Sequence, residues 1–343
     1  MEIRRLGRTG MRVSQWCLGA MMFGKRGNRD YTSYERIVHR SLEAEINFVD
    51  TADVYSAGES EQILGAALKG RRENVILATK CFNPMGKDLN RRGGSRRWIV
   101  QAVEESLSRL DTDYIDLYQL HRLDPAVELE ESLSAMDDLV RQGKIRYVGT
   151  STARAEQIVE AHWIAERRGF DPIRCEQPPY SIFSRAIEAS VLPTCQRYGM
   201  GVMTWSPLNA GWLSGKYSRD QVKPEGTRSA QNALFPQWWD WDAPAVRRKF
   251  DLLDELKKLA AKAGLSLIDL SLAFATEHPA VTSAIIGPRT EAQLEEMLAG
   301  TGTCLTSDVL DRIDELVPPG SDVDPSNSAE INLDLTRPAN RRR

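Results

Sequence analysis

Short apolar segments alternate with amphipathic segments along most of the chain. Eight of the apolar segments are four to eight residues long, and most of them are apolar throughout instead of alternating with polar residues. This pattern is typical of strands that are buried on both faces, as in a parallel sheet. The sequence therefore predicts strands at residues 15–19, 47–50, 75–80, 114–121, 147–151, 173–177, 202–206 and 282–287.

The segments between these strands carry the pattern of amphipathic helices. Within residues 98–110 and again within 129–140, apolar side chains recur at helical spacing and would share one helix face. Gly143 follows the second stripe, and glycine commonly ends helices because it tolerates a left-handed backbone. Ser266 and Thr290 each stand three residues before a side chain that can complete a capping box, which predicts the starts of two later helices.

The spacing of the predicted strands indicates one repeating unit. Most successive strand ends are about 30 residues apart, which is the size of a βα unit, and eight such units close a (β/α)8 barrel. A doubly wound sheet would explain the alternation but not eight units, and it usually carries a glycine fingerprint. Residues 199–204 begin such a fingerprint but lack its third glycine. We therefore predict an α/β protein with a single TIM barrel over residues 14–317.

Three segments lie outside this repeat. Residues 1–13 hold apolar positions on either side of a glycine-containing turn and predict a β-hairpin ahead of the barrel. The polar segment 318–343 predicts a tail, either a frayed terminus or part of a subunit contact. The proline-containing insertion 218–244 holds three tryptophans within residues 238–241, and tryptophan is costly to expose. This cluster would be a lid over the substrate, a cofactor clasp or a subunit contact.

Composition limits the class of protein. The chain has 343 residues, of which 41% are hydrophobic and 27% are charged, so it can build a sizeable core. A formal net charge of -3 argues against a nucleic-acid partner, and no apolar run approaches the ~20 residues that span a bilayer. The five cysteines form no Cys-x-x-Cys pair, so neither a disulfide scaffold nor a metal site is expected. The first residues do not resemble a signal peptide, and we expect a soluble cytoplasmic protein without a membrane partner.

Four side chains at predicted strand ends suggest proton chemistry at a carbonyl group. Asp50, Lys80 and His121 end three consecutive strands, and Tyr55 lies five residues beyond the first of these ends. In a barrel, the carboxyl ends of the strands meet at one rim, where catalytic residues gather. An unperturbed tyrosine has a pKa near ~10, which makes it a weak acid at neutral pH, and a nearby ammonium group lowers that pKa.

These residue types predict specific roles. Lys80 would lower the pKa of Tyr55, and Asp50 would hold Lys80 in place by an ion pair. Neutral His121 would donate a hydrogen bond to the carbonyl oxygen of the substrate. None of these groups can deliver a hydride, so a cofactor must supply it. Taken singly, each residue also has a structural explanation, and Cys81 is either a reactive thiol near the pocket or a buried, inert one.

Several separated motifs give the chain a resemblance to the aldo-keto reductase superfamily. They are the segment from Asp50 to Tyr55, the strand end at 78–80, the segment from Tyr118 to His121, and residues 141–149 and 205–217. The similarity covers residues 5–297, which is nearly the whole chain. The subgroup that the chain most resembles contains bacterial general-stress reductases, potassium-channel β-subunits, and sugar or polyketide ketoreductases of actinobacteria.

The resemblance implies a role for each matching residue. For the four rim residues it implies the roles predicted above, with Tyr55 as the proton donor. Ser151, Thr152 and Gln177 would hold the nicotinamide carboxamide, although Thr152 stands where asparagine is common. The loop that covers the pyrophosphate would contain Trp205, Ser206, Leu208, Gly211 and Lys216. The segment that grips the adenosine 2′-phosphate would contain Gly287, Arg289, Gln293 and Glu296.

A phosphate site at the last of these segments also has a physical basis. The helix predicted to begin at Thr290 offers free N–H groups to an anion, and the planar guanidinium of Arg289 matches phosphate oxygens. The sequence therefore favours NADPH over NADH. Gln293 is explained equally well as the side chain that completes the Thr290 capping box.

The predicted substrate is a bulky carbonyl compound. Met22, Phe23, Phe82 and Asn83 follow two predicted strands and are expected to line an apolar pocket. We predict NADPH-dependent reduction of an aldehyde or ketone, such as a sugar or polyketide intermediate, by a homo-oligomeric enzyme. Two alternatives stay open, namely reduction of an enone in a deoxysugar or polyketide precursor, and a cofactor-binding regulatory subunit of the channel β-subunit type.

Overall fold

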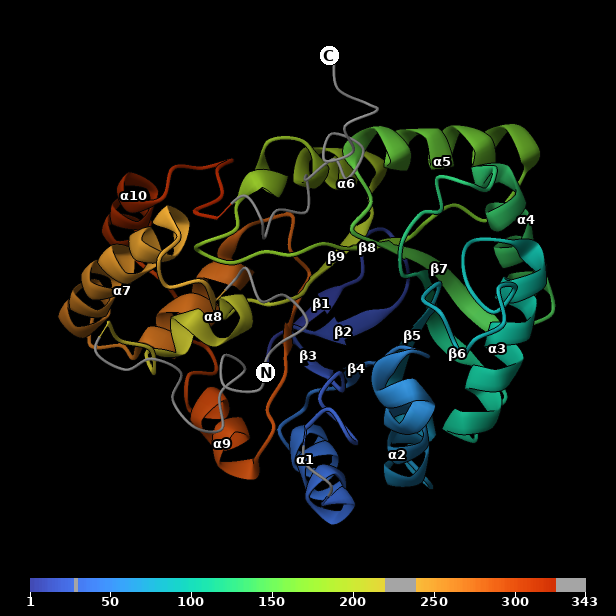
Figure 1. Ribbon diagram of the computed structural model, residues 1–343, viewed down its shortest axis with the longest axis horizontal. Coiled ribbons are helices and arrows are strands. Elements are labelled where there is room, and N and C mark those ends of the chain that lie inside the picture. Colours follow the sequence, from blue (N-terminus) through green and yellow to red (C-terminus); the bar gives the residue numbers. More distant parts are fainter. Residues whose placement is uncertain (28–29, 220–238, 325–343) are drawn as a thin grey trace.

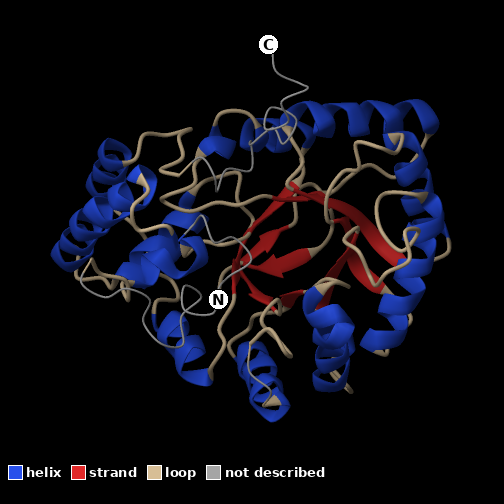
Figure 2. Ribbon diagram, viewed as in Figure 1, coloured by secondary structure: helices blue, strands red, loops and turns tan. Residues whose placement is uncertain are grey.

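Eight parallel strands close into a barrel in the computed structural model, which describes residues 1–27, 30–219 and 239–324. Figure 2 shows the strands in red at the centre, with the helices outside them. The strands pair in the order β10-β3-β4-β5-β6-β7-β8-β9, and β9 also pairs with β10, which closes the ring. The barrel strands are β3 (Trp16–Gly19), β4 (Phe48–Asp50), β5 (Ile76–Cys81), β6 (Ile115–Leu120), β7 (Ile145–Ser151), β8 (Cys175–Gln177), β9 (Gly201–Thr204) and β10 (Ser283–Ile286).

All eight strands predicted from the apolar segments are present. The predicted carboxyl ends at residues 19, 50, 151 and 177 coincide with the observed ends, and the other four lie within two residues of them. The strands pair in chain order around one closed sheet, and a doubly wound sheet would instead be open. The prediction of a (β/α)8 barrel is therefore confirmed.

An outer ring of helices covers the barrel (Figure 1). They are α1 (Tyr31–Glu43), α2 (Glu59–Ala67), α3 (Arg96–Leu110), α4 (Leu129–Arg141), α5 (Ala155–Arg168), α6 (Val191–Tyr198), α7 (Pro244–Lys262), α8 (Leu267–Glu277), α9 (Glu291–Ala299) and α10 (Ser307–Leu316). Ser95 caps α3, and Ser266 forms the predicted capping box at α8. Among the described residues no single helix is long and apolar enough to span a bilayer, although α7 and α8 meet that length and composition as a pair bent by 91°.

The first two strands form the predicted hairpin and close the amino end of the barrel. β1 (Ile3–Arg5) pairs with β2 (Arg12–Ser14) in antiparallel register. Leu6, in the turn, packs into a cluster with apolar side chains from inside the barrel. Gly7 lies so close to the chain before β9 that a Cβ atom would approach the carbonyl oxygen of Gly199 within 2.4 Å. The hairpin thus seals one end of the barrel and leaves the carboxyl end of the strands for a site.

The tail begins with a segment that is fastened to the barrel. Asp322 accepts hydrogen bonds from the backbone N–H groups of Arg185 and Ala186, at 2.8 and 3.0 Å. Asp324 forms a 2.7 Å ion pair with Lys249 of α7, and both side chains are buried. The prediction of a frayed terminus from residue 318 is therefore wrong for residues 318–324, because this segment has buried polar partners elsewhere in the chain. Residues 325–343 lie outside the described part of the structure.

The described tryptophans of the insertion pack against aromatic residues of the same chain. The ring of Trp239 stacks on Trp212 at 5.4 Å between centroids, and Trp241 stacks on Phe250 of α7 at 4.9 Å. Trp212 belongs to the 3-10 helix η4 (Asn209–Ser214), which follows β9. Packing within the chain accounts for these two side chains, while Trp238 lies outside the described residues.

Candidate active site

The four predicted catalytic side chains meet at the carboxyl rim of the barrel. Asp50 is the last residue of β4, Lys80 is the last but one of β5, and His121 directly follows β6. Tyr55 begins the short 3-10 helix η1 (Tyr55–Gly58) in the loop after β4. Because β4, β5 and β6 are neighbours in the barrel, residues from three distant parts of the sequence converge.

The ammonium group of Lys80 lies at the centre of this group. Its Nζ donates hydrogen bonds to Asp50 Oδ2 at 2.7 Å and to the carbonyl oxygen of Thr51 at 2.6 Å, and it lies 3.4 Å from the hydroxyl of Tyr55. Lys80 is completely buried, and Asp50 is 3% exposed. Burial alone would lower the pKa of Lys80, but the negative charge of Asp50 and the contact with Tyr55 outweigh burial and raise it. The predicted ion pair is present, and Lys80 stays charged.

The second oxygen of Asp50 is held by two glutamines. Its Oδ1 accepts hydrogen bonds from Gln177 Nε2 at 2.9 Å and from Gln119 Nε2 at 3.3 Å. Our sequence analysis did not single out Gln119, although it stands two residues before His121 in a strand and therefore points to the same side of the sheet. Both carboxylate oxygens of Asp50 are thus fixed, and with them the position of Lys80.

The phenol of Tyr55 is buried beside the ammonium, with 9% of the residue exposed. The charge of Lys80 lowers the pKa of Tyr55, as predicted, but burial has the larger effect, and the net pKa lies above its ordinary value. The expectation of a lowered Tyr55 pKa is therefore wrong for this structure, because desolvation penalises the phenolate more than the neighbouring charge favours it. The hydroxyl stays protonated at neutral pH, which is the form that can give up a proton.

His121 is held in its neutral form. Burial lowers its pKa well below the ordinary value, and the positive charges of Lys80, Arg122 and Arg26 add to this effect. The amide nitrogen of Asn83 lies 3.0 Å from His121 Nδ1. An amide nitrogen can only donate, so Nδ1 is the acceptor and the ring proton resides on Nε2. The free N–H of the imidazole can then donate to a substrate.

The next two strand ends carry the residues expected to hold the nicotinamide. Ser151 Oγ donates to the carbonyl oxygen of Gln177 at 3.0 Å. Thr152 has a positive φ of 59°, and its buried hydroxyl has no hydrogen-bond partner among the described residues. The side-chain carbonyl of Gln177 is likewise unbonded in the described part of the chain, since only its nitrogen contacts Asp50 and Gln119. Two polar groups are therefore available to a ligand at this rim.

A buried carboxyl group fixes the backbone of this loop. Glu176 accepts hydrogen bonds from the N–H of Ala153 at 3.0 Å and from the hydroxyl of Thr150. Burial raises the pKa of Glu176 to about 7, and the hydrogen bonds from Thr150 and the backbone partly offset this effect. The loop that contains Thr152 is therefore held by Glu176, a carboxyl group that titrates near neutral pH.

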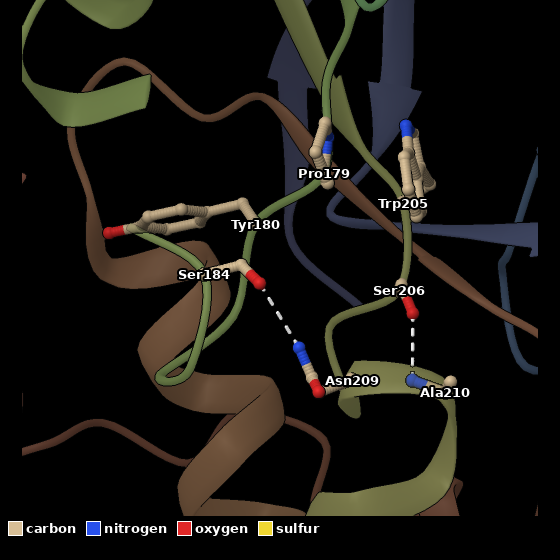
Figure 3. A pocket seen from close by; sticks show the side chains of 7 residues that line it. All are labelled: Pro179, Tyr180, Ser184, Trp205, Ser206, Asn209 and Ala210. Carbon is tan, nitrogen blue, oxygen red and sulfur yellow. Dashed lines mark hydrogen bonds between the residues drawn. The ribbon is translucent and has the colours of Figure 1, made fainter. Parts of the chain in front are cut away.

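A cavity lies in the loop after β9, where the pyrophosphate was expected (Figure 3). It holds about 10 Å³, roughly the room of one water molecule, and is lined by Pro179, Tyr180, Ser184, Trp205, Ser206, Asn209 and Ala210. Ser206 Oγ accepts from the N–H of Ala210 at 2.8 Å, and Asn209 Nδ2 donates to Ser184 Oγ at 3.1 Å. Of the predicted residues, Trp205 and Ser206 line this cavity. Leu208 is half-buried against the core, and the nearby Gly211 lies against Lys216.

Strained backbone concentrates at the same rim. In the described part of the chain, nine non-glycine residues have a positive φ, and seven of them lie in the loops after β4, β5, β7 and β9. Such conformations are costly and gather at functional sites. The seven residues are Ser56, Ala57, Phe82, Thr152, Ser206, Asn209 and Ala210.

The segment predicted to bind the 2′-phosphate opens α9. The hydroxyl of Thr290 caps the helix by accepting from the N–H of Gln293, and Gln293 Oε1 accepts from the N–H of Arg289. The side chain of Gln293 therefore serves the start of the helix, as the capping explanation predicted. Gly287, which precedes α9, and Glu296, within α9, are both exposed, and Arg289 is half-buried.

The expected substrate pocket is only partly supported. Phe23 is 0% exposed and stacks on Tyr34 of α1 at 4.4 Å between centroids, so it belongs to the core and not to a pocket wall. Met22 is also buried, whereas Phe82 and Asn83 are half-buried, and Asn83 contacts His121. Cys81 is fully buried, and burial raises its pKa far above the ordinary range, which is the inert alternative. The described residues contain no cluster of three potential metal ligands.

The comparisons with known proteins agree with this geometry. The sequence profile described as "Aldo/keto reductase family" matches residues 16–318, so the chain belongs to the aldo/keto reductase family. It is 35% identical over 324 residues to a probable voltage-gated potassium channel subunit beta from Oryza sativa subsp. japonica, covering 92% of this chain and 97% of the relative. It is 35% identical over 334 residues to the uncharacterized oxidoreductase YrpG of Bacillus subtilis, covering 94% and 98%. The family supports an oxidoreductase that uses a nicotinamide cofactor to reduce carbonyl groups.

Proposed function

We propose that this protein reduces an aldehyde or ketone to the alcohol, with NADPH as the hydride donor and Tyr55 as the proton donor. The observation that carries this proposal is the contact of a protonated, buried phenol with the charged ammonium of Lys80, 3.4 Å away. Neutral His121, with its proton on Nε2, completes the set of donors that a carbonyl oxygen requires.

The groups at the rim fit a nicotinamide cofactor. The buried hydroxyl of Thr152 and the side-chain carbonyl of Gln177 lack partners in the described residues and match the donor and acceptor of a carboxamide. Trp205 and Ser206 lie in the loop after β9, where the resemblance places the pyrophosphate, and Arg289 precedes a helix N-terminus. NADPH bound here would supply the hydride that no side chain can supply.

The chain's own residues handle the proton. The carbonyl oxygen of the substrate would accept hydrogen bonds from Tyr55 Oη and His121 Nε2, which fixes its orientation. As negative charge develops on that oxygen, the proton of Tyr55 moves to it, and the ammonium of Lys80 stabilises the phenolate left behind. Asp50 keeps the ammonium in position through the 2.7 Å ion pair. Reprotonation from solvent restores the phenol.

The proposed substrate is a bulky carbonyl compound such as a sugar or polyketide intermediate, and an enone is the alternative within the same chemistry. Phe82 is half-buried and directly precedes Asn83 in the loop after β5, which favours a substrate with apolar surface. The same hydride and proton donors serve both reactions, so the position of the substrate across Tyr55 decides between them. Product analysis by mass spectrometry separates an allylic alcohol from a saturated ketone.

Tyr55→Phe tests the proposed reaction. The variant removes only the hydroxyl, so we expect NADPH oxidation with a panel of aldehydes and ketones to fall by about 100-fold or more. The dissociation constant for NADPH, measured by its fluorescence, should stay within about 2-fold of wild type. Turnover at the wild-type rate in Tyr55→Phe would exclude Tyr55 as the proton donor.

The second candidate function is a regulatory subunit. Its support is the similarity to relatives that are described as potassium channel β-subunits. A protein of this kind would bind NADPH tightly but show little turnover with the carbonyl panel. Turnover above about 1 per second, in the ordinary enzyme range, favours the reductase.

A further inference from the structure

Two arginines stand beside the proposed catalytic pair, and no acidic side chain of the described residues pairs with either of them. Arg122 follows His121, and its Nη1 donates to the carbonyl oxygen of His121 and lies 3.4 Å from Ser151 Oγ. The guanidinium carbon of Arg26 lies 6.0 Å from the centre of the Tyr55 ring. The positive charges of both arginines act on His121, and that of Arg122 also acts on the phenol of Tyr55.

Neither guanidinium forms an ion pair with a carboxylate in the part of the chain that the structure describes. The Nε and Nη2 groups of Arg122 make no hydrogen bond with any described residue, and Arg26 contacts Ser56 only through its backbone N–H. Glu176, whose charge acts on Arg122, accepts instead from Thr150 and from the N–H of Ala153. Within residues 1–27, 30–219 and 239–324, no carboxylate therefore neutralises the positive charge of these two arginines.

Such an arrangement is costly unless a ligand completes it. Both arginines are half-buried, and a guanidinium withdrawn from water without a counter-ion loses hydration that nothing replaces. Lys80 differs from the two arginines, because Asp50 neutralises its charge through an ion pair of 2.7 Å. The planar guanidinium group matches the paired oxygens of a carboxylate or phosphate better than any other side chain does.

We propose that Arg26 and Arg122 form an anion-binding subsite next to Tyr55, and that the substrate carries a carboxylate or phosphate group as well as its carbonyl. This inference rests on the proposed reductase function and narrows its substrate class. The reducible carbon lies at Tyr55 and His121, and the anionic group lies toward the two guanidinium groups. A bulky neutral carbonyl compound would leave both charges uncompensated and would bind less well.

Three aldehydes that share one ring test the subsite. They are 4-carboxybenzaldehyde, its neutral methyl ester and 4-formylphenyl phosphate, each assayed by NADPH oxidation. We expect kcat/KM for the two anionic aldehydes to exceed that of the ester by about 10-fold or more, because a hydrogen bond between charged groups contributes more than one to a neutral group. Arg122→Gln and Arg26→Gln should each lower kcat/KM for the two anionic aldehydes far more than for the ester, so that the anionic and neutral aldehydes come to within about 2-fold of each other. Arg97→Gln, at an exposed arginine on α3, is the matched control and should change neither.

Binding without turnover separates this inference from the proposed reaction. By calorimetry we expect benzoate and phenyl phosphate to bind the NADP⁺-loaded protein at least 10-fold more tightly than benzamide, and Arg122→Gln to abolish the difference. If no aldehyde is reduced but the anions still bind through the arginines, the reductase proposal fails and the subsite stands. Equal kcat/KM for ester and acid in wild type, or a loss of NADPH affinity in Arg122→Gln as large as its loss of anion affinity, would overturn the subsite. Preference for only one of the two anions identifies which group the substrate carries.

Discussion

The amide nitrogen of Asn83 lies 3.0 Å from Nδ1 of His121 and so determines which ring nitrogen carries the proton. The two residues come from the loop after β5 and the end of β6, which are neighbouring strands. Since Nδ1 accepts this hydrogen bond, Nε2 carries the proton and can donate to a carbonyl oxygen. Asn83 therefore has a positioning role beyond the pocket lining that we expected from the sequence.

Replacing Asn83 by Asp should invert this tautomer. A carboxylate can only accept, so the proton would move to Nδ1, and Nε2 of the neutral ring would no longer be a donor. At low pH the ring becomes fully protonated and regains the Nε2–H donor. We therefore expect kcat of Asn83→Asp to fall by about 10-fold or more as the pH rises through the imidazole pKa, whereas wild type shows no such step there.

The control for this experiment is Asn83→Ala, which removes the constraint without imposing the wrong tautomer. It should lose less activity than Asn83→Asp and should show no added pH step. Parallel pH–rate profiles for the two variants would mean that Asn83 acts on the local structure and not on the proton of His121.

The ion pair of Lys80 and Asp50 should be strongly coupled in stability. Both side chains are buried, so removal of one partner leaves a buried charge and should lower the free energy of unfolding by about 3–5 kcal/mol. We expect Lys80→Met and Asp50→Asn each to show this loss in urea unfolding. The double variant should lose less than the sum, with a coupling energy of about 1 kcal/mol or more. Additive losses would show that the two charges do not depend on each other.

The apolar pattern of the sequence contained most of the information about the fold. Strands buried on both faces read as continuous apolar runs, and the polar residue that ends each run marks the carboxyl rim, as Asp50, Ser151 and Gln177 show. The position of the catalytic candidates therefore followed from the strand ends alone. Their electrostatics did not follow, because the pKa of Tyr55 depends on burial that only the packed structure reveals.

Residues without periodic surroundings escaped the sequence analysis. Arg26 lies in a loop between β3 and α1, and nothing in the local pattern places it beside Tyr55. The polar segment 318–324 resembles a loose end, but a buried ion pair links Asp324 to Lys249, which lies 75 residues away in the sequence. Gln119 is the exception, since the two-residue alternation of a strand could have placed it beside His121.

Glu176 should make the stability of the protein depend on pH near neutrality. Its pKa is raised from 4.5 to about 7 by burial, so the folded state holds a proton that the unfolded state releases above pH 4.5. The contribution of Glu176 to the free energy of unfolding is fully present below pH 4.5. It decreases as the pH rises from 4.5 through about 7, by roughly 3 kcal/mol in total. Urea unfolding at several pH values should show a decline between pH 5 and pH 7 that is smaller in Glu176→Gln. The same decline in both proteins would assign it to other groups.

Residues 318–324 should stabilise the protein because Asp324 neutralises the buried charge of Lys249. A chain that ends at residue 317 loses Asp324 and leaves Lys249 buried without its partner, which should lower the free energy of unfolding by about 3–5 kcal/mol. In that truncated chain, Lys249→Met removes the uncompensated charge and should raise the free energy of unfolding. In the full-length chain the same substitution removes the cation that pairs with the buried Asp324 and should lower the free energy of unfolding. A chain that ends at residue 324 keeps the ion pair and is the matched control for the truncation. If Lys249→Met acts in the same direction in the short and the full-length chains, the ion pair is not what holds the segment.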